Sequence, residues 1–385
     1  MTTTTTEATS TSTSTSRAHR EIEQARAALE RVLVGRELEA GLVTLGLLTR
    51  QHVLLIGDPG TGKSALCRAT GAIFGLREAE CQLGKFVHRD EILGQPSLQA
   101  IREDKQIRRT EGYIAGSELG FLDEVWRASG GLLNSLLLLL NERVVIQDGR
   151  RERCPLVSVV SAANHWPAEE NWQDLEALAD RFLIRHSVER VAAEKWDSLL
   201  YGDFDEPEQT TDLDTLTQAQ AEVEQVLVGM AARLAYRKVL DKCVQAGVYP
   251  GDRRARQCVA LMQATAWMAG RDEVQVEDID TLRWALWNDP RKAEQVRAII
   301  DEVVDPHGLQ AYKLQIEAET LVKATKESLA KGDIDTSKDQ LMSLRSKLKD
   351  YLAAVKGWQQ SPRVVKFNAF CFDQLNWANA RLLDM

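Results

Sequence analysis

Residues 57–64 read Gly-Asp-Pro-Gly-Thr-Gly-Lys-Ser, which fits the phosphate-binding loop pattern G-x-x-x-x-G-K-[ST]. A short apolar run, Val53–Ile56, comes directly before the loop and predicts a buried parallel strand. The residues that follow the loop predict a helix. A glycine loop between a strand and a helix N-terminus presents backbone N–H groups and the positive end of a dipole to phosphate. The chain is therefore predicted to bind a nucleoside triphosphate.

Each residue type in this loop has a chemical role. The glycines let the backbone crowd the phosphates, Lys63 reaches the β- and γ-oxygens, and Ser64 ligates Mg²⁺. A chance turn between a strand and a helix is the alternative, but it does not explain four fixed positions in the right context. The predicted cofactors are ATP and Mg²⁺. The predicted ATP-binding segment comprises Gly57, Asp58, Pro59, Gly60, Thr61, Gly62, Lys63, Ser64 and Ala65.

Composition narrows the class of protein. A length of 385 residues predicts two or three domains. The net charge of −9 argues against broad nucleic-acid binding, although local basic patches remain open. The six cysteines show no C-x-x-C spacing, which predicts reduced thiols in a cytoplasmic protein and no zinc site. No apolar run is long enough to span a bilayer.

Strand-like and helical segments alternate along the first half of the chain. Residues 1–20 begin with a run of Thr and Ser and are predicted to be a disordered tail. Over residues 21–200, further strands are predicted at Leu119–Leu122, Leu156–Ala162 and Phe182–Ile184. This alternation predicts an α/β core with a parallel sheet.

The second half of the chain is predicted to be helical. Residues 201–215 are acidic and predict a linker, and residues 216–289 predict an α-helical domain. Residues 290–385 are mostly charged helix. There, Leu309–Lys331 and Asp335–Lys356 are predicted to pair as a helical hairpin joined at Gly332-Asp333.

Two excursions from the sheet are predicted to be β-hairpins. The first pairs Leu98–Ile101 with Gln106–Arg109, and the second pairs Arg143–Ile146 with Arg151–Cys154 around an Asp148-Gly149 turn. Such excursions often reach a partner or a pore. Plain surface loops are an equal alternative.

Two acids close the second predicted strand. A carboxylate at a strand end beside a phosphate loop suits a Mg²⁺ ligand, and Asp123 takes this role directly or through a bound water. Glu124 is then predicted to be the general base that polarises the attacking water. The alternative is an acid pair favoured by a helix N-terminus.

Two residues further along the chain, Asn164 and Arg181, are also candidates for the site. Asn164 ends the third strand and is predicted to orient the attacking water, although Asn also commonly starts turns. Arg181 lies too far along the chain to reach its own pocket by simple wrapping, so it suits the site of a neighbouring subunit, with Arg185 as second choice. From the sequence alone, a surface ion pair of Arg181 with Asp180 or Glu176 is the stronger alternative.

A second pair of arginines opens a helix predicted over Ala255–Ala269. Arg253 and Arg254 follow the capping residue Asp252, and positive charge in a first turn opposes the helix dipole. Either arginine is therefore predicted to reach the γ-phosphate. Two surface arginines without a ligand are the alternative.

Taken in order, these segments resemble the MoxR family of AAA+ ATPases, and most closely its RavA branch. The resemblance covers residues 21–287. It rests on residues 57–64, 121–128, 140–143, 162–164, 180–185 and 251–254. The tail after Trp287 does not match the β-rich C-terminal region of RavA-type proteins.

The resemblance implies roles that agree with the chemical interpretation. Asp123 and Glu124 look like the Walker B pair, Asn164 like sensor 1, Arg181 like the arginine finger, and Arg253 like sensor 2, with Arg254 as the competing choice. The fold it implies is an αβα AAA+ core followed by an all-α lid, with both hairpins as insertions typical of the clade. It also implies a homo-oligomeric ring, usually a hexamer, and a partner with a von Willebrand factor A domain.

Three functions compete. The first is an ATPase that remodels or matures a partner protein in a chaperone-like way. The second is a nucleotide-gated scaffold with little hydrolysis, although a scaffold has no chemical need for Glu124. The third is a nucleic-acid motor that uses basic residues on the hairpins, which the acidic balance and the lack of aromatic residues in those hairpins disfavour.

Overall fold

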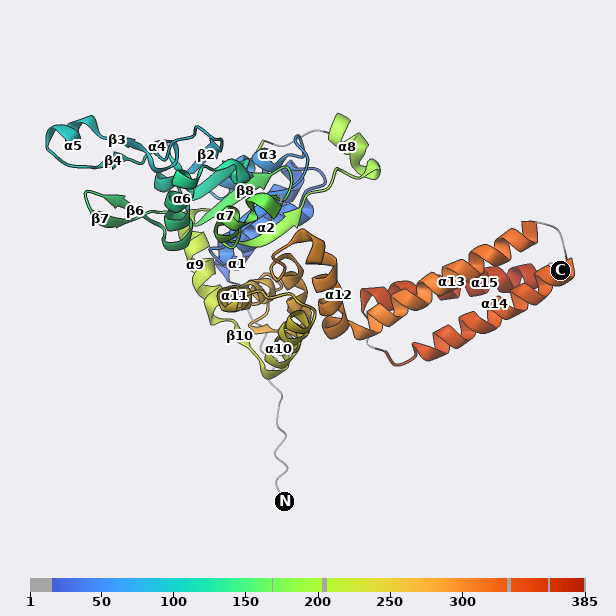
Figure 1. Ribbon diagram of the computed structural model, residues 1–385. Helices are drawn as coiled ribbons and strands as arrows, with labels where there is room; N and C mark the ends of the chain where they lie inside the picture. The colour runs from blue at the N-terminus through green and yellow to red at the C-terminus, as the bar shows by residue number, and fades with distance from the viewer. Residues whose placement is uncertain (1–15, 168, 203–205, 331–333, 359–360, 384–385) are drawn as a thin grey trace, which may run out of the picture. The chain divides into compact units, whose positions relative to one another are not determined.

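The computed structural model in Figure 1 describes residues 16–167, 169–202, 206–330, 334–358 and 361–383. The chain divides into two compact units, Met1–Arg233 with Gly247–Ala293, and Leu234–Ala246 with Glu294–Met385. Most of the predicted disordered tail, residues 1–20, lies outside the described residues. Helix α1 already begins at Arg17, so the last four residues of that segment are helical.

The first unit contains a five-stranded sheet whose neighbouring strands all pair in parallel, in the order β2-β5-β8-β1-β9. The strands are β1 (His52–Ile56), β2 (Glu78–Gln82), β5 (Leu119–Asp123), β8 (Ser158–Ala163) and β9 (Phe182–Ser187). This confirms the predicted α/β core. Strand β1 is buried along its whole length, as expected for a central strand covered on both faces.

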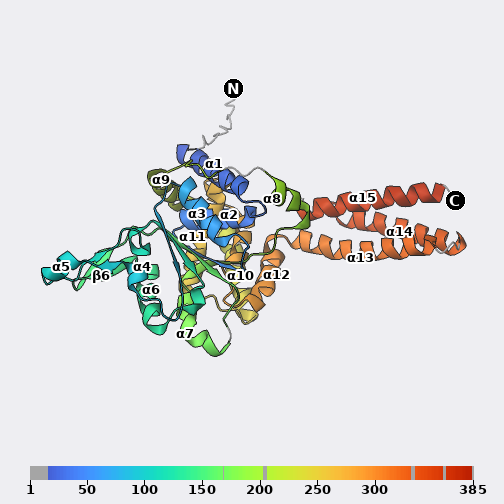
Figure 2. The same ribbon diagram turned by 90° about the horizontal axis from the view of Figure 1, so that it is seen from above.

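Helices cover both faces of this sheet. In Figure 2 the strands run between α2 and α3 on one side and α6 and α7 on the other. The helices of this part are α1 (Arg17–Val32), α2 (Glu37–Leu48), α3 (Lys63–Ile73), α6 (Gly130–Glu142), α7 (Glu169–Ala179) and α8 (Trp196–Tyr201). Short 3-10 turns occur at η1 (Ile114–Gly116), η2 (Val125–Arg127) and η3 (Ala193–Lys195). Gly35, with a φ of +72°, lies in the turn between α1 and α2.

The second excursion is the predicted β-hairpin. Strand β6 (Val144–Gln147) pairs antiparallel with β7 (Arg150–Arg153). Asp148 and Gly149 join them with positive φ angles of 49° and 74°. Two consecutive positive φ angles are typical of the tight turn that matches the twist of a hairpin.

The first excursion differs from its prediction. Its outer part, Leu98–Arg102, is helix α5 instead of a strand, because Ser97 caps it by accepting a hydrogen bond from the Ala100 N–H (3.3 Å). Pairing is confined to β3 (Gln95–Pro96) and β4 (Arg108–Arg109) at its base. Helix α4 (Asp90–Leu93) leads into it.

The predicted helical domain follows the core. The elements in this stretch of the chain are α9 (Leu213–Gln225), β10 (Leu227–Val228), α10 (Met230–Gln245), α11 (Asp252–Met268), β11 (Glu273–Val274), η4 (Val276–Trp284) and η5 (Pro290–Lys292). From Leu234 onward, α10 belongs to the second unit. Within the first unit, Gln220 donates to Leu47 O (2.7 Å) and so ties α9 to α2.

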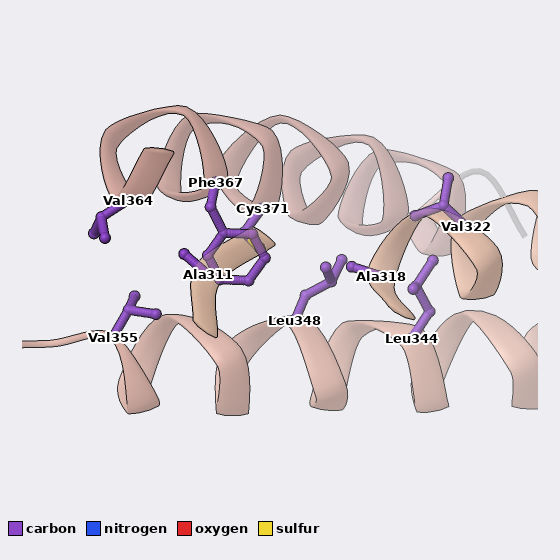
Figure 3. Packing of buried hydrophobic residues seen from close by; sticks show 9 residues of the cluster. All are labelled: Ala311, Ala318, Val322, Leu344, Leu348, Val355, Val364, Phe367 and Cys371. Atoms are coloured by element: carbon purple, nitrogen blue, oxygen red, sulfur yellow. The ribbon is translucent and has the colours of Figure 1, made fainter. Parts of the chain in front are cut away.

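The second unit contains a bundle of three helices where the sequence predicted two. After α12 (Ala293–Val304) come α13 (Pro306–Ala330), α14 (Ile334–Ala354) and α15 (Pro362–Leu383). The predicted joint at Gly332-Asp333 lies outside the described residues. Figure 3 shows Phe367 of α15 among side chains of the other two helices. Among the residues that the structure describes, no helix is long and apolar enough to cross a membrane.

His52, the first residue of β1, links two elements of the core. Its side chain is 3% exposed. The Val159 N–H donates to Nδ1 (3.0 Å), so Nε2 carries the proton and donates to Leu140 O (2.8 Å). Burial, and then the positive charge of Arg143, lower the pKa of His52 to about 3. The ring is therefore neutral at every physiological pH.

We expect acid to destabilise the protein through His52. The unfolded chain binds a proton near pH 6.5 and the folded chain does not, so the free energy of unfolding falls by about 2 kcal/mol between pH 7.5 and pH 5. The loss ends at the folded pKa, near 3. Denaturant unfolding across this range should show a shallower pH dependence for His52→Gln. The exposed His165→Gln is the matched control, and equal slopes for wild type and His52→Gln would contradict the assignment.

Candidate active site

The glycine loop lies where the sequence predicted it, between the end of β1 and the start of α3. The Gly57 N–H donates to Ala163 O (2.9 Å), which fixes the loop to the end of β8. Gly60 and Gly62 have φ angles of +80° and +82°, a region that side chains other than glycine rarely adopt. A Cβ added at Gly57 would lie 2.6 Å from Val188 O, so the backbone approach also requires glycine there.

Lys63 lies inside the curve of this loop and is 9% exposed. Its Nζ donates to Gly57 O (2.8 Å), Asp58 O (2.9 Å) and Thr61 Oγ1 (3.2 Å). Burial lowers the pKa of Lys63, and the charge of Asp123 is the largest effect that opposes it. The ammonium is thus held inside the loop by two backbone carbonyls and a hydroxyl, and it is near enough to a strand-terminal carboxylate to feel its charge.

Asp123, Glu124 and Asn164 meet at the same edge of the sheet as the loop. They follow neighbouring parallel strands, whose carboxyl ends share one edge. The Glu124 N–H donates to Asp123 Oδ1 (2.9 Å), and Asn164 Nδ2 donates to Glu124 Oε1 (2.7 Å). Glu124 has a φ of +53°, which is strained for a residue with a side chain. Strain and a fixed rotamer at one carboxylate are features of functional sites.

The oxygen ligands present fit Mg²⁺. Asp123 ends β5 and Ser64 lies in the first turn of α3. Lys63, which directly precedes Ser64, is close enough for the Asp123 charge to affect its pKa. Carboxylate and hydroxyl oxygens are the donors that Mg²⁺ takes, and this ion usually keeps several waters and substrate phosphates as its remaining ligands. One carboxylate and one hydroxyl are therefore sufficient.

Arg181 lies at the opposite end of the strands, directly before β9 begins. It precedes Phe182, which pairs with His52 at the start of β1. Because β1 rises about 3.3 Å per residue, about 13 Å of strand separates this end from the loop after Ile56. The Arg181 Nε is buried without a hydrogen-bond partner, and Nη1 lies 3.3 Å from Asp180 Oδ2.

Arg253 lies at the same end of the strands as Arg181. After burial, its positive charge is the main cause that lowers the pKa of Arg181. One turn along α11, Gln257 donates to Gln51 Oε1 (2.9 Å), directly before β1. Arg253 therefore lies near the start of β1, whereas the glycine loop follows the end of that strand.

Arg254 has a different environment from Arg253. It is 2% exposed and donates to Leu183 O (3.0 Å) and Ala285 O (2.8 Å) as well as to Asp180. These bonds join the helical domain to β9. The structure thus assigns Arg254 to packing, and of the two candidates only Arg253 is exposed.

Arg185, the second choice for a finger, is also a packing residue. It is 1% exposed and donates to the carbonyls of Phe182 (3.0 Å), Ala179 (2.8 Å) and Trp287 (2.6 Å). Its guanidinium lies 5.7 Å from the ring centres of both Trp166 and Trp287. A buried arginine with these partners cannot extend to another subunit.

Arg36, which no motif in the sequence singles out, supports the loop from outside. It is 6% exposed, and it donates through Nε to Thr61 O (2.9 Å) and through Nη1 to Glu189 O (2.9 Å). Arg36 therefore connects the loop to the segment after β9. No local pattern distinguishes this arginine from a surface residue that precedes a helix.

Comparison with known proteins identifies this arrangement. Residues 20–227 match the family model described as "MoxR domain in the MoxR-vWA-beta-propeller ternary systems". The chain belongs to the MoxR family of AAA+ ATPases. Residues 225–300 match the AAA lid domain, which agrees with the helical domain after the core.

Relatives of this MoxR-family chain cover most of its length. It is 29% identical to the uncharacterized protein MJ0079 of Methanocaldococcus jannaschii over 82% of this chain and 81% of that protein. It is 27% identical to the chaperone MoxR1 of Mycobacterium tuberculosis over 67% and 72%. A crystal structure from Cytophaga hutchinsonii superposes with a TM-score of 0.61 at 17% identity, covering 74% of this chain and 94% of that one, which shows the shared fold.

Proposed function

We propose that this MoxR-family protein hydrolyses ATP at the subunit interfaces of a ring, a hexamer by family resemblance. The observation that carries this proposal is the separation of two half-sites. One half-site lies at the C-terminal ends of the strands and contains Lys63, Asp123, Glu124 and Asn164. The other half-site contains Arg181, at the N-terminal end of β9. A closed ring brings such opposite faces of neighbouring copies together.

The residues of one subunit bind and activate the substrate. Backbone N–H groups of residues 60–65 and the Lys63 ammonium hold the phosphates of ATP, and Ser64 and Asp123 would be the Mg²⁺ ligands. When bound, Mg²⁺ neutralises charge on the phosphate oxygens. Glu124, oriented by Asn164, accepts a proton from the attacking water.

Arginines of the neighbouring subunit complete the site. Arg181 and Arg253 present positive charge beside the carboxylate of Asp180, which Arg254 also contacts. This excess of positive charge suits the charge that develops on a transferring phosphoryl group. Hydrolysis therefore depends on assembly, and the energy released moves the subunits against one another.

The matched family model supports a partner with a von Willebrand factor A domain, because its description names MoxR-vWA-beta-propeller systems. We therefore propose that the protein remodels or matures such a partner, or a complex that contains it. We also propose that the protein belongs to the RavA branch and is cytoplasmic. Its proposed domain limits lie at residues 200, 215 and 289.

ATPase activity should depend on protein concentration. At concentrations where sedimentation velocity detects only single subunits, we expect the rate per subunit to fall by about 10³-fold or more, because the neighbouring arginine is absent. Above the assembly concentration the rate per subunit should be constant. A rate per subunit that does not change across the assembly range would contradict hydrolysis at interfaces.

A further inference from the structure

Arg36, which takes no part in the proposed hydrolysis, is a charged side chain buried against the glycine loop. The residue is 6% exposed. Its counter-charge is Glu39, whose Oε1 lies 3.5 Å from Arg36 Nη1 and 3.4 Å from His186 Nε2. An arginine side chain stays charged at physiological pH, and a carboxylate offsets part of the cost of removing that charge from water. Arg36 therefore places a permanent positive charge against the loop.

One hydrogen bond of Arg36 fixes the orientation of a peptide group in the loop. Arg36 Nε donates to Thr61 O (2.9 Å). The Thr61 carbonyl and the Gly62 N–H belong to the same planar trans peptide, in which the two groups point in opposite directions. The Gly62 N–H must therefore point away from Arg36. Gly62 is also the N-cap residue of α3, where backbone N–H groups lack partners within the helix and can bind an anion.

A second bond of Arg36 ties the loop to the segment after β9. Arg36 Nη1 donates to Glu189 O (2.9 Å). The neighbouring Val188 lies against the start of the loop, since a Cβ added at Gly57 would be 2.6 Å from Val188 O. The first residue of the loop and its fifth, Thr61, are thus both held by residues 188–189, the fifth through Arg36. A binding loop held in this way before its ligand arrives loses less conformational freedom on binding.

The charge of Arg36 is felt inside the loop. Burial is the largest cause that lowers the pKa of Lys63, and the positive charge of Arg36 adds to it. Two positive charges that repel each other gain from a ligand with several negative charges. The phosphate chain of a nucleotide is such a ligand.

We propose that Arg36 is a positioning residue for the phosphate chain of the nucleotide. It directs the Gly62 N–H toward the bound phosphates and adds positive charge behind the loop. It acts through the Thr61–Gly62 peptide, not by contact with the ligand. The inference rests on the proposed function, because it requires that this loop bind ATP. It also implies that the effect of Arg36 depends on the phosphates and not on the base or the ribose.

The test compares ATP with inorganic tripolyphosphate, which has the phosphate chain but no base or ribose. Both compete with a fluorescent ATP analogue for the full chain in the presence of Mg²⁺. Arg36→Met removes the charge and the donors, and should weaken both ligands by the same factor, about tenfold or more. If ATP weakens and tripolyphosphate does not, Arg36 serves the base or the ribose, and the proposal is wrong. Unchanged affinity for both ligands would also overturn it.

Two variants show which property of Arg36 matters. Arg36→Lys keeps the charge but loses the planar fork that reaches Thr61 O and Glu189 O together, so both ligands should bind about threefold more weakly. Wild-type affinity in this variant would overturn the role of the Thr61–Gly62 peptide. The matched control is Arg190→Met, whose arginine pairs with Asp58 of the same loop (2.9 Å) but is 85% exposed. It should change both affinities by no more than about twofold, and a loss equal to that of Arg36→Met would contradict the proposal.

A further control separates positioning from a general loss of stability. Arg185→Met also removes a buried arginine, at the other end of the strands. Both Met variants should have lower thermal unfolding midpoints, but only Arg36→Met should weaken tripolyphosphate. Equal weakening in Arg185→Met would overturn the assignment. If Arg36→Met does not fold, Arg36→Lys decides the question.

Steady-state kinetics give an independent measurement. Arg36→Met should raise the KM for ATP about tenfold and keep kcat within about threefold, because the interaction holds the phosphates before and during the reaction. A fall in kcat with an unchanged KM would contradict the proposal. If wild type binds neither ligand, the proposed ATPase function and this inference both fail. If wild type hydrolyses ATP and Arg36→Met binds both ligands equally well, only this inference fails.

Discussion

Arg181→Ala should lower the ATPase rate of the assembled protein by about 10³-fold or more, because an arginine supplied to a phosphoryl-transfer site has an effect of that size. ATP binding should persist, since the nucleotide loop lies at the other end of the strands. The measurement is steady-state phosphate release, with binding of a fluorescent ATP analogue as the second readout.

Two comparisons make this result specific. Arg256→Ala removes an exposed arginine from the same helix as Arg253 and should leave the rate unchanged. Arg181→Lys keeps the charge but loses the planar guanidinium, so only a small part of the rate should return. If Arg181→Ala assembles and hydrolyses ATP at the wild-type rate, Arg181 is a structural residue that pairs with Asp180.

Glu124→Gln should reduce hydrolysis by about 10²–10⁴-fold, the range typical of losing a general base. Glutamine keeps an oxygen that can accept the Asn164 hydrogen bond (2.7 Å in the structure), so the geometry should be preserved. The variant should therefore bind ATP and retain it, which single-turnover measurements would show.

A fast Glu124→Gln variant would contradict the proposed role of this carboxylate. A rate within tenfold of wild type would mean that Glu124 does not accept the proton. The control is Glu142→Gln, an exposed acid at the end of α6 on the surface of the same unit, which should have the wild-type rate.

Much of the nucleotide site could be predicted because its residues follow buried strands. Runs such as Val53–Ile56 and Leu119–Leu122 are apolar throughout, so both strands were apparent, and parallel pairing then places Lys63, Asp123 and Asn164 at one edge. Strand β2 was missed because it lies at the sheet edge and alternates polar with apolar residues. That pattern is too short to distinguish from a loop.

The choice between Arg253 and Arg254 could not be made from the sequence. Neighbouring residues on a helix point about 100° apart, and which one faces the core depends on how the whole helix is rotated against its surroundings. The contacts of Arg254 with Leu183 O and Ala285 O come from residues 71 and 31 positions away. The same applies to Arg36, whose contacts are long-range.

The third helix of the bundle, α15, has a clear apolar pattern in the sequence. Val364, Phe367, Cys371 and Ala378 recur at helical spacing and are fully buried. An apolar stripe of this kind predicts an amphipathic helix. The pair of helices predicted for the tail had no other element to cover its apolar face, and α15 supplies that cover.

Mixing two inactive proteins tests shared sites most directly. An Arg181→Ala subunit keeps Glu124, and a Glu124→Gln subunit keeps Arg181, so a neighbouring pair can form one complete site. In an equal mixture allowed to exchange subunits, about a quarter of the interfaces should be competent, and phosphate release should rise well above the sum of the two separate proteins. A mixed ring as inactive as its components would contradict a site completed by the neighbour's Arg181.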